Sequence, residues 1–410
     1  MNNIITNEEE IKNSGDLDTN NNSQSYDQFL KDRTLLQILP SLYSGGVERG
    51  TVEIARAAVN AGMNSMVVSS GGKLVNQIES DGSKHITIDA ESKNPLTIRS
   101  NSKELIEIIE EHNVDIVHAR SRAPAWSAYK ACQKTNAHFI TTFHGLHSLK
   151  GIGKRKYNSV MTFGEKVITA SQFISDHIQK EYDVPKEKIL VIPRGVDMDY
   201  FDPDKVSDDR VNALKAKWGI NDNRPVIFLP GRITRWKGQD FLLDSLSRLT
   251  EAPSYYCIIA GDSFRHPKYH MELTQKIIEL NLGKFVKIVD STDDMPAAYK
   301  LSNLVISASQ KPEAFGRVAI EAQAMGKPVV VTNIGGSRET VINGTTGRRV
   351  DPNFTKEMSE GILKGLMLSD SQKQNIARVN RQHIFDNFSL EQMCSKTLGL
   401  YKSIINNEVI

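Results

Sequence analysis

Cysteine is scarce in this 410-residue sequence, which contains only Cys132, Cys257 and Cys394. The three lie far apart and form neither a CxxC pair nor a zinc-type spacing. We therefore expect isolated thiols, which fits a reducing compartment. Long apolar runs are also missing. No stretch reaches the roughly 18 residues that a membrane span needs, so none is predicted.

Residues 1–32 have little apolar character and are rich in Asn, Asp, Glu and Ser. They show neither the basic start nor the apolar core of a signal peptide. We expect a disordered N-terminal tail and a cytoplasmic protein. The formal net charge is only +2, so the charge balance does not indicate nucleic acid as a partner.

Apolar strand patterns alternate with helical patterns along most of the chain. Strands are predicted near residues 34–39, 65–69, 115–118, 139–143, 166–170 and 189–192, with helices between them. After a turn-rich connection at 193–204, the alternation restarts with strands near 226–229, 255–260, 286–289, 304–307 and 328–332. Such alternation predicts an α/β protein with two doubly wound, Rossmann-like domains. The predicted domains are 33–195 and 196–384. A C-terminal helix, within 385–410, is expected to pack back toward the first domain.

The segment SGGVERG, residues 44–50, follows the first strand and opens the first helix. Gly45 and Gly46 let the backbone turn sharply and approach a ligand closely. The free N–H groups of the helix start can then hold an anion. A tight turn without a ligand is the alternative. Neither GxGxxG nor GxxxxGK[ST] occurs, which disfavours a dehydrogenase and a P-loop enzyme.

The segment PGRITRWKG, residues 230–238, follows the first strand of the second domain. It brings Arg232 and Lys237 to the carboxyl edge of the sheet, where ligands bind in such folds. Two cations at this edge suit a diphosphate, because Arg offers forked donors and Lys a point charge. A pair of solvated basic side chains is the alternative.

The segment PEAFGRVAIEAQAMGKPVV, residues 312–330, is the most informative. Glu313 lies just before a helix start and can accept hydrogen bonds from sugar hydroxyls. Glu321, two turns along, can reach ribose hydroxyls. A phosphate can bind the unpaired N–H groups where the helix begins. These residues are Phe315, Gly316, Arg317 and Val318. A helix with one acidic cap and one surface glutamate is the alternative.

The segment TTFHGLH, residues 141–147, ends a strand of the first domain. It places His144 at the carboxyl end of that strand, facing the predicted cleft. His147 is the weaker candidate. A structural histidine is the alternative for both.

In this order, SGGVER, TFHG, GR-x4-KG and E-x7-EA resemble the retaining glycosyltransferases of family 4, which have the GT-B fold. The resemblance covers about residues 34–405. It implies a retaining, hexosyltransferase-type enzyme whose co-substrate is a nucleotide-sugar donor, expected to be UDP-linked, with residues 33–195 on the acceptor side and 196–384 binding the nucleotide-sugar. We expect no metal requirement, because two cations and a helix start can stabilise the departing diphosphate. Residues 144–171 further resemble transferases of lipopolysaccharide core and surface-polysaccharide synthesis, which implies a saccharide or lipid-linked acceptor.

The resemblance also assigns roles to residues. Gly45 and Gly46 match the glycine loop near the donor phosphates, and Arg232 and Lys237 match the diphosphate-binding pair. Three more assignments concern the sugar and the ribose: Glu313 and His144 lie near the transferred sugar, and Glu321 contacts the ribose. Arg317 departs from the family, in which a small or apolar residue is common there. Residues 334–339, IGGSRE, resemble the family's loop after the penultimate strand, with a simple turn at the Gly-Gly pair as the alternative.

Residues 150–156 read KGIGKRK and carry four basic side chains, and apolar residues follow up to 163. We expect residues 150–163 to bind an anionic membrane surface, with a solvated loop as the alternative. Two other protein classes remain open. A GT-B-fold sugar-nucleotide epimerase would need no acceptor, and a silent binding protein would not need the whole set of charged residues.

Overall fold

The computed structural model describes residues 28–408, apart from 44, 148, 150, 250–251, 263 and 265. Most of the predicted tail, residues 1–27, lies outside the described part. The prediction that the tail extends to residue 32 is wrong, because Leu30 is fully buried. Its side chain packs in the core of the first domain, and the N–H of Asp32 donates to the carbonyl of Gly62 at 3.0 Å.

The first domain is a seven-stranded parallel sheet in the order β3-β2-β1-β4-β5-β6-β7. Its strands are β1 (Thr34–Ile38), β2 (Asn64–Ser69), β3 (Lys84–Thr87), β4 (Ile116–Ala119), β5 (His138–Phe143), β6 (Lys166–Thr169) and β7 (Ile189–Val191). Its helices are α2 (Gly46–Asn60), α3 (Val75–Ser80), α4 (Pro95–Glu111), α5 (Arg122–Cys132), α6 (Lys154–Asn158) and α7 (Gln172–Tyr182).

The second domain is a six-stranded parallel sheet in the order β10-β9-β8-β11-β12-β13. Its strands are β8 (Val226–Pro230), β9 (Tyr256–Ala260), β10 (Val286–Val289), β11 (Leu304–Ser307), β12 (Val329–Thr332) and β13 (Arg348–Val350). Its helices are α8 (Asp208–Lys217), α9 (Gln239–Leu246), α10 (Pro267–Glu279), α11 (Met295–Leu301), α12 (Arg317–Ala324), α13 (Ser337–Thr340) and α14 (Thr355–Leu366). The two sheets establish the two Rossmann-like domains of the predicted fold class.

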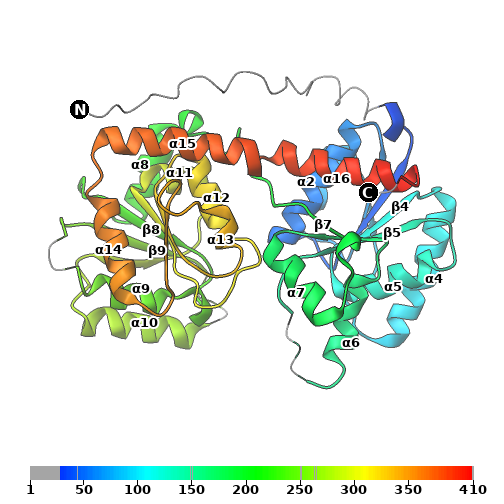
Figure 1. The fold of residues 1–410 in the computed structure, drawn as a ribbon, viewed down its shortest axis with the longest axis horizontal. Helices are drawn as coiled ribbons and strands as arrows, with labels where there is room; N and C mark the ends of the chain where they lie inside the picture. Colours follow the sequence, from blue (N-terminus) through cyan, green and yellow to red (C-terminus); the bar gives the residue numbers. More distant parts are fainter. Residues whose placement is uncertain are drawn as a thin grey trace, which may run out of the picture.

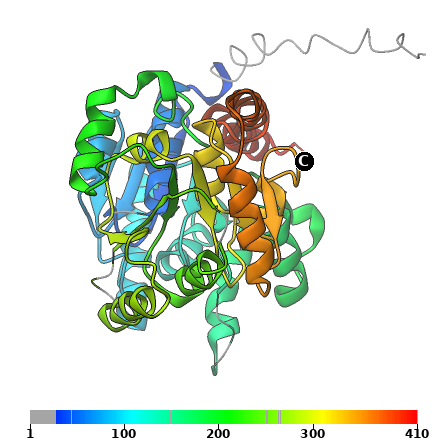
Figure 2. The same ribbon diagram turned by 90° about the vertical axis from the view of Figure 1, so that its left-hand side faces the viewer.

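The central strands contribute side chains to two cores, because successive residues of a strand point to opposite faces of the sheet. Along β8, Phe228 packs in one core of the second domain, and its neighbours Ile227 and Leu229 pack in the other. The strand therefore reads as a continuous apolar run and is covered by helices on both faces. Figure 2 shows this layering with the second domain toward the viewer.

Two long C-terminal helices, α15 (Asp370–Phe388) and α16 (Leu390–Ile405), run along one side of both domains (Figure 1). Ser389 separates them, and its side chain accepts from the N–H of Gln392 at 3.3 Å, which starts α16 anew. α15 packs on α12 of the second domain, so that domain extends to Phe388 and not to 384. α16 packs on α2, and the hydroxyl of Tyr401 lies 2.7 Å from Nδ1 of His118 under the first sheet.

The chain passes between the domains twice, at Val196 and at Ser389, and these two segments lie side by side. The N–H of Val196 donates to the carbonyl of Phe388 at 2.8 Å, and the N–H of Leu390 donates back to Val196 at 2.9 Å. A Cβ on Gly195 would lie 2.6 Å from the Cα of Leu390, so glycine is what permits this close approach. The hinge is therefore a pair of hydrogen-bonded segments that brings the carboxyl edges of the two sheets face to face.

Candidate active site

Both sheets place the predicted motifs where their strand order reverses. In the first sheet the reversal lies between β1 and β4, and Gly45 and Gly46 follow β1. In the second it lies between β8 and β11; Arg232 and Lys237 follow β8, and Glu313 follows β11. Ligands of doubly wound sheets bind outside the carboxyl ends of the strands at such reversals. The topology therefore brings motifs from distant parts of the chain to one cleft.

Lys237 and Glu313 form an ion pair at the second reversal. Nζ of Lys237 lies 2.8 Å from Oε1 of Glu313, and the two side chains are only 14% and 12% exposed. The hydroxyl of Ser309 donates to the same oxygen. Gly238 fixes the loop, because its φ is +72° and a Cβ there would lie 1.9 Å from the carbonyl oxygen of Ala308. The pair is thus held on a backbone that only glycine allows.

Arg232 and Lys237 both lie near the aromatic ring of Trp236. Nζ of Lys237 lies 4.5 Å from the ring centroid of Trp236, and Cζ of Arg232 lies 5.8 Å from the same centroid. Arg232 is exposed and has no ion-pair partner among the residues that the structure describes. The structure therefore brings the two predicted cations together and leaves the guanidinium available to an anion.

The helix start that the sequence indicated is α12. Gly316 is its N-cap with φ +97°, and no side chain caps the first N–H groups. Phe315, however, is buried in the core and packs on Phe388 with the ring centroids 5.7 Å apart, so only its backbone can face a ligand. Val318 is partly buried against the same core.

Both carboxylate oxygens of Glu321 are already engaged. Oε1 accepts from Nε of Arg317 at 3.1 Å, and Oε2 accepts from the hydroxyl of Tyr299 at 3.0 Å. Burial and the adjacent Glu321 hold the pKa of Tyr299 well above its usual range, so the phenol stays a donor. The side chain of Arg317 is therefore directed toward Glu321. Its Cδ also lies near the glycine loop, 3.8 Å from the position that a Cβ on Gly46 would take.

His144 lies after β5 and is held by a residue that the sequence analysis did not select. Nη2 of Arg194 donates a short hydrogen bond to Nδ1 of His144. A guanidinium can only donate, so Nδ1 accepts and the ring proton belongs on Nε2. Nε2 is buried and has no partner in the described part of the chain. Burial, followed by the charges of Arg194 and Arg120, holds the pKa of His144 well below its usual value, so the ring is neutral.

The guanidiniums of Arg120 and Arg194 lie together beside the first turns of α2. A Cβ on Gly50 would lie 2.5 Å from Nη1 of Arg194 and 3.0 Å from Nη2 of Arg120. Arg120 is 2% exposed, and the described residues offer its side chain no ion-pair partner. Burial, and then repulsion by Arg120, lowers the pKa of Arg194 to about 9. The cluster concentrates positive charge under the glycine loop. Arg120 follows β4, so strand-end position was the signal that could have identified it.

His147 does not share this arrangement. Its ring packs on Phe143 with the centroids 5.0 Å apart, and burial lowers its pKa to about 4. We therefore interpret His147 as a neutral packing residue at the edge of the cleft.

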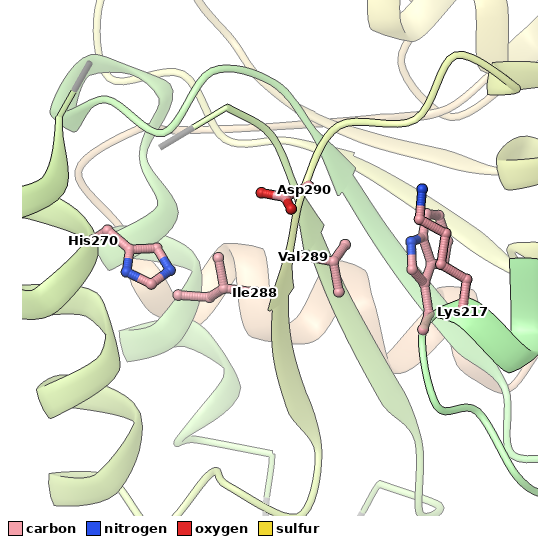
Figure 3. Close-up of a pocket in the computed structure, with 6 residues that line it drawn as sticks. Lys217, His270, Ile288, Val289 and Asp290 are labelled. Atoms are coloured by element: carbon pink, nitrogen blue, oxygen red, sulfur yellow. The ribbon is translucent and has the colours of Figure 1, made fainter. Parts of the chain in front are cut away.

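A cavity of about 460 Å³ lies between the domains. Its walls include Gly45, Arg49 and Glu53 from the first domain and Tyr200, Asp293 and Arg317 from the connection and the second domain. A separate cavity of about 280 Å³ lies at the outer edge strand β10 (Figure 3). It is lined by His270 and Asp290 but by none of the motif residues. The interdomain cavity is thus lined by the glycine-loop segment and by Arg317, whereas Lys237 and Glu313 are not among its lining residues.

Two facing Rossmann-like domains, with a glycine loop at one strand reversal and paired cationic and acidic groups at the other, define the GT-B class of glycosyltransferase. Residues 44–200 match the family model described as Glycosyltransferase Family 4, and residues 211–382 match Glycosyl transferases group 1. The crystal structure of a glycosyltransferase from Rickettsia africae is 41% identical with a TM-score of 0.85, and the match covers 92% of this chain and 100% of that one. The chain belongs to this glycosyltransferase family.

Other proteins of lower sequence identity also match this chain. An uncharacterized glycosyltransferase of Methanocaldococcus jannaschii is 26% identical over 58% of this chain, and the match spans only 60% of that protein. Anabaena HepE, solved with UDP-glucose, is 23% identical with a TM-score of 0.77, covering 90% of this chain and 99% of that one. WaaG, a glycosyltransferase involved in lipopolysaccharide biosynthesis, is 16% identical with a TM-score of 0.67 over 90% and 99%. These two structures share the fold.

Among the described residues, no helix combines the length and apolar character that crossing a membrane requires. Within the predicted membrane-binding segment 150–163, Met161 and Thr162 are buried and so cannot contact a membrane surface, whereas Phe163 is 37% exposed. Lys150 lies outside the described residues.

Proposed function

We propose that the protein transfers a sugar from a UDP-sugar to a saccharide or lipid-linked saccharide acceptor, with retention at the anomeric carbon. The observation that carries this proposal is the Lys237–Glu313 pair, which shares its sheet edge with Arg232 and the start of α12. Two cations and free helix N–H groups suit a diphosphate. The UDP-glucose complex of HepE supports the choice of nucleotide, since that protein has the same fold.

Departure of the diphosphate is the demanding step. The bond from the anomeric carbon to the phosphate oxygen breaks, and its electron pair stays on the diphosphate. Lys237 and Arg232 stabilise that negative charge as it develops. Because a diphosphate competes for the ammonium of Lys237, it releases the carboxylate of Glu313 to accept from sugar hydroxyls. The acceptor oxygen bonds to the same face of the sugar and passes its proton to the departing phosphate oxygen.

Residues of the first domain complete the site. His144 offers Nε2–H as a hydrogen-bond donor, because Arg194 occupies Nδ1. Cations and a helix start supply the charge stabilisation in this proposal, so we expect no metal requirement. Transfer measured after EDTA treatment should equal transfer without it. Loss of activity with EDTA that added Mg²⁺ or Mn²⁺ restores would overturn this part of the proposal.

The donor can be identified by thermal denaturation with UDP-, GDP- and ADP-sugars, because a ligand that binds the native state raises the melting temperature. We expect the largest rise with a UDP-sugar. Incubating the best donor alone separates the proposal from a sugar-nucleotide epimerase, which forms an epimer without any acceptor. Product that forms only when acceptor is present supports transfer, and an epimer formed from donor alone contradicts it.

We further propose that the enzyme acts in lipopolysaccharide or surface-polysaccharide synthesis from the cytoplasmic face of the membrane. Ile152 is fully exposed, and Lys154 and Lys156 beside it are exposed as well. Arg155 is engaged elsewhere, since it donates to the carbonyl of Glu181 at 2.8 Å and pairs with Asp183 at 3.0 Å. One apolar and two basic side chains suit an anionic lipid surface.

Sedimentation with liposomes tests the membrane contact. Vesicles that contain anionic lipid should retain the protein at low salt, and neutral vesicles should not. The double variant Lys154→Ala, Lys156→Ala should lose retention. Equal sedimentation of variant and wild type, or none by wild type, would contradict the membrane contact and leave the transfer reaction unaffected.

A further inference from the structure

The carboxylate of Glu339, in the second domain, caps a helix of the first. Glu339 belongs to α13, and α7 faces it across the space between the domains (Figure 1). Oε2 accepts from the N–H of Gln172 at 2.7 Å, and Oε1 accepts from the N–H of Phe173 at 2.8 Å. These are the first N–H groups of α7, which have no partner within the helix. A carboxylate is the group that such a helix end favours, because it also meets the positive end of the helix dipole.

A second contact supports the same junction. Ser171, the N-cap of α7, accepts from the N–H of Ile174 at 3.2 Å and donates its own hydroxyl proton to the carbonyl of Ala314 at 2.6 Å. The methyl group of Ala314 packs against the core of the first domain. The start of α7 therefore contacts two segments of the second domain, one of which directly follows Glu313.

The two segments of the second domain are themselves locked together. The N–H of Gly336 donates to the carbonyl of Glu313 at 2.9 Å. A Cβ on Gly335 would lie 2.5 Å from that carbonyl oxygen, and a Cβ on Gly336 would lie 2.4 Å from the Cα of Phe315. The glycines thus let backbone pack on backbone, so Glu339 and Glu313 move as one unit. The Gly-Gly pair of residues 334–339 is more than a turn, since it connects the interdomain contact to the site.

We propose that Glu339 is an interdomain latch, which holds the cleft closed through α7 and so positions Glu313 opposite His144. The proposal rests on the proposed function for the roles of Glu313 and His144. Each domain has its own sheet, and Ala170 and Ala314 pack across the junction without Glu339, so the Glu339 contact is not needed to fold either domain. Glu339 and Gln172 are partly or fully exposed, so water replaces the lost bonds when the cleft opens.

The test uses the full chain with Glu339→Ala, Glu339→Gln and a control, Glu357→Ala. Glu357 also accepts a backbone N–H, that of Asp351 at 3.0 Å, but within the second domain at α14. The measurements are the radius of gyration by small-angle scattering with and without UDP, the affinity for UDP, and kcat/KM for transfer. Melting temperatures establish that each variant is folded.

We expect Glu339→Ala to be more expanded than wild type, with and without UDP. UDP affinity should change less than transfer, because Arg232, Lys237 and the start of α12 lie in the second domain. Transfer should fall about tenfold in kcat/KM, the scale expected when a helix cap is lost. Glu339→Gln should resemble Glu339→Ala, because the amide NH₂ opposes one of the two N–H donors. Glu357→Ala should match wild type.

Scattering curves of Glu339→Ala and wild type that superimpose would overturn the latch, whatever the activity. Wild-type behaviour of Glu339→Gln would also overturn it, because the carboxylate would then not be the closing group. If wild type transfers no sugar, the proposed function fails, and the scattering comparison still decides whether Glu339 closes the cleft.

Discussion

The guanidinium of Arg194 donates to Nδ1 of His144, and this contact determines which ring nitrogen carries the proton. Because Nδ1 accepts, Nε2 holds the hydrogen, and Nε2 is the buried atom without a partner in the described structure. Arg194 is therefore a positioning residue that acts through His144. The positive charge of Arg194 is destabilised by Arg120, which lies beside it. Among the described residues, neither arginine forms an ion pair with an acidic side chain.

Replacing Arg194 with Met should let the imidazole of His144 adopt both tautomers. We expect transfer to fall about tenfold or more, because a misplaced imidazole proton removes a required donor. The ¹⁵N shifts of His144 should change from a protonated Nε2 to a mixture. Arg194→Lys keeps a donor and should retain more activity than Arg194→Met. A wild-type ring protonated on Nδ1 contradicts this assignment.

Buried histidines predict a loss of stability in mild acid. Burial lowers the pKa of His118 and His144 well below 6.5, and that of His147 to about 4. The unfolded chain takes up protons near about pH 6.5, and the folded chain does not, so stability is present above that pH and is lost as the pH falls below it. Each histidine costs about 1.4 kcal/mol at one pH unit below its unfolded pKa, or about 4 kcal/mol for three.

Urea unfolding at about pH 7.5 and about pH 5.5 checks this window, which lies above the range where carboxylates titrate. His147→Gln should reduce the difference by about 1.4 kcal/mol. Equal unfolding free energies at the two pH values would show that these rings are protonated in the folded protein.

Tyr299 should affect donor binding more than turnover. Tyr299→Phe removes the hydroxyl that holds Oε2 of Glu321 and leaves Arg317 on Oε1. Loss of one such hydrogen bond predicts a roughly three- to tenfold rise in KM for the donor, with kcat changed less. Tyr255→Phe is the matched control, because Tyr255 stacks on Phe285 at 5.1 Å, away from this helix. An unchanged KM in Tyr299→Phe means that Glu321 needs no orientation by the phenol.

Gly238 should be intolerant of a methyl group. Gly238→Ala combines a φ of +72° with a Cβ only 1.9 Å from the carbonyl oxygen of Ala308, so the loop must shift and Lys237 with it. We expect a loss of about 1–3 kcal/mol in the free energy of unfolding and weaker UDP binding. Gly283→Ala, where a Cβ meets nothing within 4 Å, should be neutral in both measurements. Similar results for the two variants would mean that the loop is free to move.

The sequence predicted the two sheets well because their strands are short buried apolar runs between turn signals. β3 was not predicted, because its sequence KHIT is not an apolar run: it forms an edge strand in which every residue is at least partly exposed. No helix was predicted for the region of α14 and α15, and α15 is a largely exposed helix with few buried residues, so its apolar periodicity is weak. The burial of Leu30 was not predicted, because the residue lies in an otherwise polar segment.

Site prediction succeeded where function follows from a local motif and failed where it depends on contact between domains. Lys237 and Glu313 were identified because each lies in a loop after a buried strand. Arg194 lies in a turn-rich connection whose pattern indicates only a loop. Glu339 looked like part of a turn, because its partner, the start of α7, is more than 160 residues away in the chain.

The central claim is that Arg232 and Lys237 stabilise the departing diphosphate. The most direct test is the transfer rate of Arg232→Ala and Lys237→Ala at saturating UDP-sugar and acceptor. The control is Arg235→Ala in the same loop, since Arg235 pairs with Glu272 instead. The account predicts a loss of about 10²-fold or more in each of the two variants, with the control near wild type. Wild-type turnover in either variant would contradict it.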